Sequence, residues 1–297
     1  MPTRRRVLKQ LASGAALSMI GVPAVLAKGA NGADDFTAAI RDLEARHGGR
    51  LGVAVRDTAS GRMAAHRGDE RFLLCSTVKL PAAAMILSRV DAGRESLDRH
   101  IDYAAADLVT YSPETERHVD TGMMLGAICR AGLTLSDNTA ANLMLASVGG
   151  PAALTAFLRS LGDDVTRSDR YETALNEYAP DRVHDTTSPR AMLDLMQRML
   201  LGDVLSAASQ RQLVAWMRAN ETGDHRLRAG LPDTWRIGDK TGSGGDNTAN
   251  DIAMIHPGVG GPLLVTAYYS GSEATKTQRD RVLADVGRAV ARWHVAG

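Results

Sequence analysis

The segment from Thr234 to Ser270, TWRIGDKTGSGGDNTANDIAMIHPGVGGPLLVTAYYS, carries the clearest structural pattern in the chain. Three runs within it, TWRIGDKTG, NDIAMIHP and PLLVTAYYS, are rich in apolar residues and are separated by glycines and prolines that favour turns. These runs predict three short strands. An amphipathic helix is predicted to follow, from about Thr275 to His294, because apolar residues recur there at helical spacing.

The beginning of the chain has a similar mixture of helix and strand. DDFTAAIRDLEARHG, residues 34–48, has apolar residues at helical spacing between an acidic start and a glycine stop. RLGVAVRDT and RMAAHR, residues 50–58 and 62–67, flank ASG and predict a hairpin. Strands at both ends of the chain therefore predict one antiparallel sheet that is built by the two termini.

The middle of the chain, from Ser76 to about Met217, has a helical pattern, with Met, Leu and Ala at spacings of three and four. The predicted fold class is α+β: an antiparallel sheet flanked by helices, with an inserted all-helical domain. We predict that residues 28–68 and 218–297 form the sheet domain and that residues 69–217 form the helical domain. A cleft is expected where two such domains meet.

Size and charge limit the possible functions. The chain has 297 residues, of which 44% are hydrophobic, and this is enough for a large core. The net charge is +1, and it becomes −3 when the four basic side chains among the first ten residues are left out. The remaining chain has no charge excess that would favour nucleic acid or an acidic membrane surface as a partner.

Residues 1–27 predict an export signal, with a basic TRRR start, an apolar run and the small-residue site Val-Leu-Ala at 25–27. The apolar run is too short and too early to predict a membrane span. TRRRVLK is similar to the twin-arginine export motif, with Arg4 and Arg5 as the pair and Val7 where the motif favours Phe. The alternative is an ordinary secretory signal. Both predict a periplasmic or otherwise extracytoplasmic protein without a membrane span in its mature form.

The stretch CSTVKLP, residues 75–81, places a hydroxyl and an ammonium among apolar residues. Ser76 and Lys79 share a face if this stretch is helical, so the amine could accept or relay the hydroxyl proton. A helix start would also offer unpaired backbone N–H groups to an anion. The simpler alternative is that Ser76 caps the helix and Lys79 extends to water. Pro81 fits neither alternative well, because it removes the hydrogen bond back toward Thr77.

Two other polar motifs lie next to predicted elements. SDN, residues 136–138, precedes the helical TAANLMLASVGG, and alone it is best interpreted as a helix cap. KTG, residues 240–242, ends a predicted strand. Its glycine-rich edge would allow a ligand to approach closely while the lysine and the hydroxyl hold a carboxylate. The alternative for KTG is a flexible hairpin turn.

The fourth motif is RYETALNEYAPDRVHD, residues 170–185. It contains Glu172, followed four residues later by Asn176. An arginine opens the stretch and an aspartate closes it, which suits a compact omega-type loop pinned by an ion pair. The alternative is a solvated loop in which Glu172 is exposed.

The joint order of these motifs is more specific than any one of them. Ser-x-x-Lys is followed after 60 residues by Ser-Asp-Asn, after 36 more by Glu-x-x-x-Asn and after 68 more by Lys-Thr-Gly. This arrangement resembles the class A serine β-lactamases, and the resemblance extends over residues 34–297. YSPETERH, GDKTGSGG and TANDIA are also similar to sequences of that family.

The resemblance implies hydrolysis of the β-lactam amide of penicillins and cephalosporins through a serine acyl-enzyme, which would give antibiotic resistance. It implies that Ser76 is the nucleophile and that either Lys79, or Glu172 acting through water, is the base for acylation. Ser136 would pass a proton to the ring nitrogen, and the charge of Lys240 would favour that transfer.

Two sets of site residues follow from the resemblance. The catalytic set is Ser76, Lys79, Ser136, Glu172, Asn176 and Lys240. The substrate-binding set is Tyr111, Asn138, Thr241, Gly242, Ser243 and Arg226. Arg226, from DHRLRAG, would replace the arginine that often follows the KTG strand, where this chain has Ala249. The backbone N–H groups of Ser76 and Ser243 would form the oxyanion hole.

No metal and no cofactor are implied, since the eight histidines show no metal-ligand spacing. Two cysteines cannot make a disulfide scaffold. Cys75 and Cys129 are expected to be free thiols, because the family positions of their disulfide partners are Gly244 and Ala83. The protein is expected to be a monomer whose partner is a small β-lactam.

Two rival functions share the serine–lysine chemistry. A DD-peptidase, or a β-lactam-sensing penicillin-binding module, would be acylated and then deacylate slowly. The loop with Glu172 and Asn176 argues against the peptidase. A sensor would need membrane-spanning and signalling segments, which the sequence does not predict.

Overall fold

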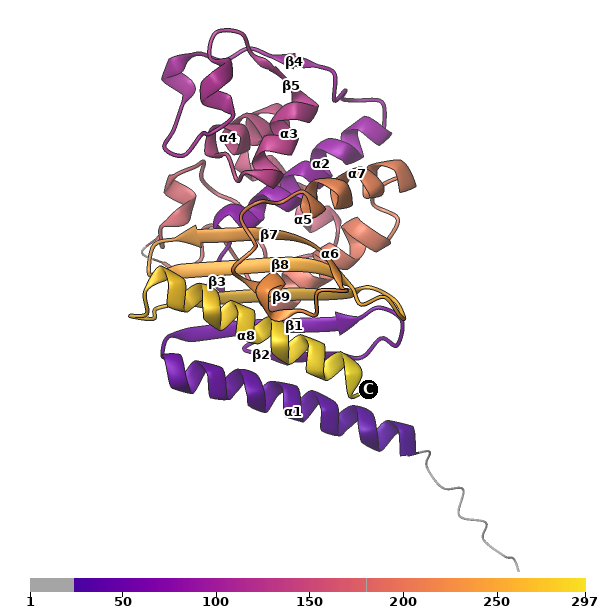
Figure 1. The fold of residues 1–297 in the computed structure, drawn as a ribbon. Coiled ribbons are helices and arrows are strands. Elements are labelled where there is room, and N and C mark those ends of the chain that lie inside the picture. Colours follow the sequence, from indigo (N-terminus) through magenta and orange to yellow (C-terminus); the bar gives the residue numbers. More distant parts are fainter. Residues whose placement is uncertain (1–23, 180) are drawn as a thin grey trace, which may run out of the picture.

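The computed structural model describes residues 24–179 and 181–297, and its centre is a five-stranded antiparallel sheet (Figure 1). The strand order is β2-β1-β9-β8-β7, so strands from the beginning of the chain pair with strands from its end. The bounds are β1 Arg50–Asp57, β2 Met63–His66, β7 Arg236–Gly244, β8 Thr248–His256 and β9 Leu263–Ser270. The predicted hairpin, the three predicted strands and the α+β fold class are confirmed.

Helices cover both faces of this sheet. On one face, Val53 and Val55 of β1 belong to a core shared with α1 (Ala24–His47) and α8 (Lys276–Val295), two helices that contact each other (Figure 1). On the other face, Ala54 belongs to the core of the middle of the chain. Successive side chains of a strand point to opposite faces, so strands buried on both faces are apolar along their whole length.

The second face of the sheet carries the helices of the middle of the chain (Figure 1). The α-helices there are α2 Lys79–Asp91, α3 Leu125–Thr134, α4 Asn138–Ser147, α5 Pro151–Ser160, α6 Pro189–Leu201 and α7 Ala207–Arg218. The 3-10 turns are η1 Cys75–Val78, η2 Ala105–Asp107, η3 Thr115–His118, η4 Ala174–Asn176 and η5 Leu227–Gly230.

Two short ribbons lie within the region that the sequence predicts to be all-helical. Their strands are β3 Phe72–Leu73 with β6 Thr186–Thr187, and β4 His100–Ile101 with β5 Met123–Met124. Strands of two residues are too short to show an alternating pattern, which is why the sequence did not predict them. The division into a sheet domain and a helical domain at residues 68 and 218 remains a prediction.

Residues 1–23 of the predicted export signal lie outside the described part of the chain. The first helix, α1, begins at Ala24, earlier than the helix predicted from residue 34. Within the described part of the chain, no single helix is long and apolar enough to cross a membrane. Helices α4 and α5 meet that criterion only as a pair, and they are bent by 66° against each other.

Candidate active site

Ser76 and Lys79 lie in the junction between η1 and α2, and both are buried. The Lys79 ammonium donates to Ser76 Oγ over 2.8 Å. No side-chain cap was found at the start of η1 or α2, and Lys79 is 0% exposed, so neither the capping nor the extended-lysine alternative describes this structure. Pro81 is accommodated in the first turn of α2, where a missing N–H costs little.

Four oxygen atoms lie within 3.1 Å of the Lys79 ammonium. They are Ser76 Oγ, Ser136 O and Asn138 Oδ1, each at 2.8 Å, and Glu172 Oε1 at 3.1 Å. Burial lowers the pKa of Lys79, and the Glu172 carboxylate opposes that shift. An amine with a lowered pKa that contacts a hydroxyl is chemically suited to accept its proton.

In the SDN motif, the middle residue caps helix α4 and its two neighbours face the site. Asp137, not Ser136, caps α4 by accepting a hydrogen bond from the Ala140 N–H over 2.8 Å. Ser136 has a left-handed backbone with φ of +61°. Both neighbours of Asp137 then contact Lys79, since Ser136 Oγ lies 3.4 Å and Asn138 Oδ1 lies 2.8 Å from its ammonium.

The KTG motif lies on β7, one of the two edge strands of the sheet. The Lys240 ammonium is completely buried and donates to Ser136 Oγ over 3.0 Å. Burial, and after it the charge of Lys79, lower the pKa of Lys240 well below its ordinary value. At Gly242 a Cβ atom would lie 3.1 Å from both Cys75 Cβ and the Leu74 carbonyl, so the glycine permits β7 to approach the serine-bearing turn.

The loop 170–185 is closed by an ion pair at its ends. Asp185 Oδ2 accepts from Arg170 Nε over 2.6 Å, and Asp185 Oδ1 accepts from two backbone N–H groups. Glu172 is 5% exposed, so the loop is not the solvated alternative. The Glu172 carboxylate accepts from Asn176 Nδ2 over 2.5 Å and lies 3.4 Å from Ser76 Oγ.

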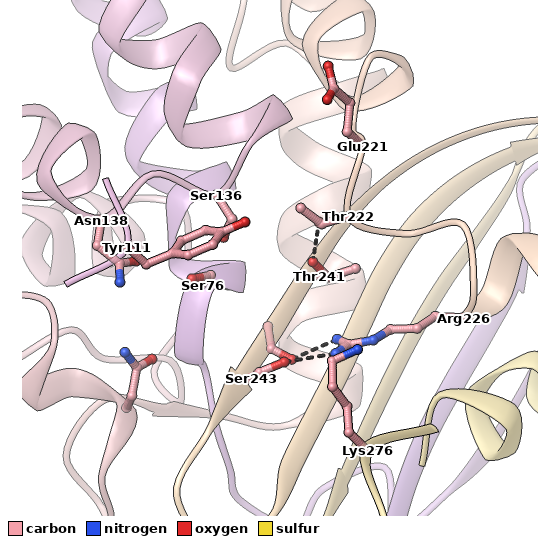
Figure 2. A pocket seen from close by; sticks show the side chains of 12 residues that line it. Ser76, Tyr111, Ser136, Asn138, Glu221, Thr222, Arg226, Thr241, Ser243 and Lys276 are labelled. Atoms are coloured by element: carbon pink, nitrogen blue, oxygen red, sulfur yellow. Dashed lines mark hydrogen bonds between the residues drawn. The ribbon is translucent and has the colours of Figure 1, made fainter. Parts of the chain in front are cut away.

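A pocket of about 490 Å³ opens over these groups (Figure 2). Its lining includes all six predicted substrate-binding residues, three predicted catalytic residues and three residues that were not predicted: Ser76, Tyr111, Ser136, Asn138, Asn176, Glu221, Thr222, Arg226, Thr241, Gly242, Ser243 and Lys276. Lys79, Glu172 and Lys240 are not part of the lining but touch the residues that are. The structure therefore brings all twelve predicted site residues together.

Arg226 reaches the pocket from the segment before η5. Its guanidinium donates to Ser243 Oγ over 2.8 Å (Figure 2). It also donates to the Gly242 carbonyl over 2.8 Å. Asp280 of α8 fixes the other side of the guanidinium at 2.9 Å and also pairs with Lys276 at 2.7 Å. Arg226 and Lys276 thus bring cationic side chains to the side of the pocket next to β7, which suits a carboxylate.

Four residues of the site were not predicted. Asn142 accepts from the Glu172 N–H over 2.8 Å and donates to its carbonyl over 3.0 Å, so it positions the glutamate. It follows Asn138 by four residues on the same helix face, a spacing that could have revealed it. Glu221, Thr222 and Lys276 belong to no motif and had no comparable signal.

Both cysteines are free and buried, as expected. A Cβ atom on Gly244 would lie 2.7 Å from Cys75 Sγ. The Cys75 thiol therefore faces Gly244, the residue that occupies the family position of its disulfide partner. Burial raises the pKa of both thiols, which makes them poor nucleophiles. No metal-ligating group of three or more His, Cys, Asp or Glu side chains occurs among residues 24–179 and 181–297.

The fold and the buried serine–lysine–glutamate cluster are those that the resemblance to the class A serine β-lactamases implies. The beta-lactamase enzyme family matches residues 35–294 of the chain. Beta-lactamase L2 of Stenotrophomonas maltophilia is 45% identical, with 98% of this chain and 99% of the relative covered. Beta-lactamase OXY-2 of Klebsiella oxytoca is 43% identical, with 93% and 96% covered. The chain therefore belongs to the beta-lactamase enzyme family.

Solved structures agree with this assignment. An ancestral (GNCA) class A beta-lactamase is similar with a TM-score of 0.85 and 58% identity, covering 86% of this chain and 99% of the other. The putative class A beta-lactamase PenP from Rhodopseudomonas palustris is similar with a TM-score of 0.84 and 57% identity, covering 86% and 98%. The protein is a class A beta-lactamase, a hydrolase that acts on the β-lactam amide.

Proposed function

We propose that the chain opens β-lactam rings through an ester formed on Ser76, and that this makes its host resistant to penicillins and cephalosporins. One observation carries the proposal. Ser76 Oγ lies at the pocket floor, 2.8 Å from a buried amine and 3.4 Å from a buried carboxylate. This combination supplies both a route for forming the ester and a base for removing it.

Acylation forms a bond from Ser76 Oγ to the lactam carbonyl carbon and then breaks the ring C–N bond. The Ser76 proton passes to Lys79 directly, or to Glu172 through a water molecule. A proton then reaches the ring nitrogen through Ser136, whose Oγ lies 3.4 Å from Lys79 Nζ and 3.0 Å from Lys240 Nζ. The N–H groups of Ser76 and Ser243 stabilise the oxyanion, and losing one such donor typically costs about 10² to 10³ in rate.

Substrate orientation falls to the β7 side of the pocket. The substrate carboxylate is held by Lys240, Thr241 and Ser136, with Arg226 acting beside Ser243. On the opposite side, Asn138 contacts the acyl group, and Tyr111, which is 56% exposed, forms the rim (Figure 2). Gly242 has no side chain, so the bound β-lactam can approach the β7 edge closely.

Deacylation needs a base that is directed at a bound water. Glu172 has that role, with Asn176 fixing one of its carboxylate oxygens and Asn142 holding its backbone. Water attacks the ester carbonyl and gives one proton to Glu172; the bond to Ser76 Oγ then breaks, and the leaving Ser76 Oγ takes up a proton from Lys79 or Glu172. A DD-peptidase or a β-lactam sensor would remain acylated at this stage.

We infer further properties from the same resemblance. Carbapenems are turned over poorly, because Cys75 lacks the disulfide of many carbapenem-hydrolysing relatives. The mature protein is a monomer that acts in the periplasm or elsewhere outside the cytoplasm, and it needs no metal or cofactor. Comparing kcat/KM for a penicillin, an oxyimino-cephalosporin and a carbapenem tests the substrate range, and equal values for carbapenem and penicillin would refute it.

The decisive experiment follows penicillin hydrolysis with wild-type protein and with Ser76→Ala. Wild-type protein should complete many turnovers, whereas Ser76→Ala should show neither turnover nor a covalent adduct in mass spectrometry. A burst of one product per enzyme without further turnover would instead support the peptidase or sensor function. Normal turnover by Ser76→Ala would remove the serine from the mechanism.

A further inference from the structure

A loop between α7 and η5 lies against the edge strand that binds the substrate carboxylate. It contains Asn220, which is 5% exposed, and Thr222, which lines the pocket. The loop is anchored at Glu221, whose N–H donates to the Thr134 carbonyl over 2.9 Å. A Cβ atom on Gly223 would overlap Oδ2 of Asp239, so this position must stay free of a side chain for the loop to lie so close to β7.

The orientation of the Asn220 amide is fixed by two independent contacts. Its Nδ2 donates to Asp239 Oδ2 over 2.5 Å, and the other carboxylate oxygen of Asp239 accepts from Arg228 Nη2 over 2.5 Å. Its Oδ1 accepts from the Thr222 N–H over 3.1 Å. A backbone N–H can only donate, so the atom that faces it must be the amide oxygen.

This orientation decides the direction of the next hydrogen bond. Thr222 Oγ1 lies 2.7 Å from Asn220 Oδ1, which has no proton, so the Thr222 hydroxyl must donate its single proton to Asn220. Thr222 Oγ1 also lies 2.5 Å from Thr241 Oγ1 (Figure 2). Since the Thr222 proton is already used, Thr241 must donate in this contact.

The Thr241 hydroxyl therefore directs its proton at Thr222 Oγ1, and only its lone pairs remain for a ligand in the pocket. A carboxylate in the pocket needs a donor at this position. To supply one, Thr241 has to turn its proton toward the substrate, and Thr222 has to turn its own proton from Asn220 to Thr241. Asn220 Oδ1 then accepts only from the Thr222 N–H, so the hydrogen bond from the Thr222 hydroxyl to Asn220 is lost when the substrate binds.

We propose that Asn220 and Thr222 are positioning residues that hold the Thr241 hydroxyl in the acceptor direction and so weaken the binding of carboxylate-bearing β-lactams. The proposal rests on the proposed function, in which Thr241 binds the substrate carboxylate. The effect concerns ground state and transition state alike, because both carry the same carboxylate. It therefore appears in the dissociation constant and in KM, and not in kcat.

The test compares Thr222→Val with Thr222→Ser. Valine has a similar shape but no hydroxyl, so Thr241 is free to donate to the substrate, whereas serine keeps the chain of hydrogen bonds. Calorimetry in the Ser76→Ala background measures penicillin binding without chemistry. We expect Thr222→Val to lower the dissociation constant about two- to tenfold, the equivalent of one net hydrogen bond, and Thr222→Ser to leave it unchanged.

A penicillin whose carboxylate is esterified serves as the control ligand. The neutral ester carbonyl is a weaker acceptor than a carboxylate, so Thr222→Val should improve the binding of the ester less than that of the free acid. In the enzyme with Ser76 intact, KM for the free acid should fall while kcat stays constant. A dissociation constant that is unchanged or raised in Thr222→Val, or an equal improvement for the ester, would overturn this inference alone. Failure of the Ser76→Ala protein to bind penicillin at all would overturn it together with the proposed function.

Discussion

Replacing Asp137 with asparagine should destabilise the enzyme strongly, because this carboxylate joins two parts of the site. Asp137 is 0% exposed. Its Oδ1 accepts from Ala140 N at 2.8 Å and Thr115 Oγ1 at 2.9 Å, and its Oδ2 accepts from Glu114 N at 3.0 Å and Thr115 N at 2.9 Å. The Oδ1 atom of asparagine can keep the hydrogen bonds from Ala140 N and Thr115 Oγ1. Its Nδ2 then faces the backbone N–H groups of Glu114 and Thr115, which are donors as well.

Hydrogen bonds to a charged acceptor contribute about 1.5 to 3 kcal/mol each, so losing two should cost about 3 kcal/mol or more. For a chain of this size, each kcal/mol lowers Tm by roughly 2 to 4 °C, which predicts a fall of about 6 to 12 °C. Differential scanning fluorimetry measures this shift, and kcat should fall as well because Ser136 and Asn138 flank the altered residue. Asp164→Asn, at an exposed position, is the control and should leave Tm unchanged. A Tm for Asp137→Asn within about 1 °C of wild type would show that these two hydrogen bonds contribute little to stability.

Three further predictions concern pH, thiols and export. Burial lowers the pKa of Lys240, so its charge is lost as the pH rises through this lowered pKa, and kcat/KM should fall at a pH below the ordinary lysine range. Lys240→Arg should move this decline to higher pH. An identical pH profile for the variant would show that the decline does not come from Lys240. A thiol reagent under denaturing, non-reducing conditions should count two free sulfhydryls, from Cys75 and Cys129, and a count of zero would mean that they bridge. Replacing Arg4 and Arg5 with lysine should abolish extracytoplasmic activity, whereas normal export would leave only the ordinary secretory route.

The sheet could be predicted from the sequence because its strands are long and apolar. Residues 263–270 are buried without exception between two layers of helices, so the run LLVTAYYS carries an unambiguous signal. The ribbon that joins Phe72–Leu73 to Thr186–Thr187 could not be predicted, since a two-residue strand has no period and its partner lies more than a hundred residues away.

The site was predictable to the extent that its chemistry is local in sequence. Ser76 and Lys79 are three residues apart and form a direct hydrogen bond, as a shared helix face requires. The chain from Asp239 through Asn220 to Thr222 and Thr241 has no such local pattern. These hydrogen bonds form only because the loop between α7 and η5 folds onto β7, and no sequence pattern predicts that contact.

Mass spectrometry of Glu172→Ala mixed with a penicillin tests whether Glu172 is the base for deacylation. The variant keeps Ser76 and Lys79, so it should form the ester, but without its base the ester should be hydrolysed about 10² to 10⁴ times more slowly. Glu177→Ala, an exposed glutamate in the same loop, is the matched control and should turn over normally. We expect a persistent adduct on Ser76 in Glu172→Ala alone. Full turnover by Glu172→Ala, without an accumulating adduct, would contradict it.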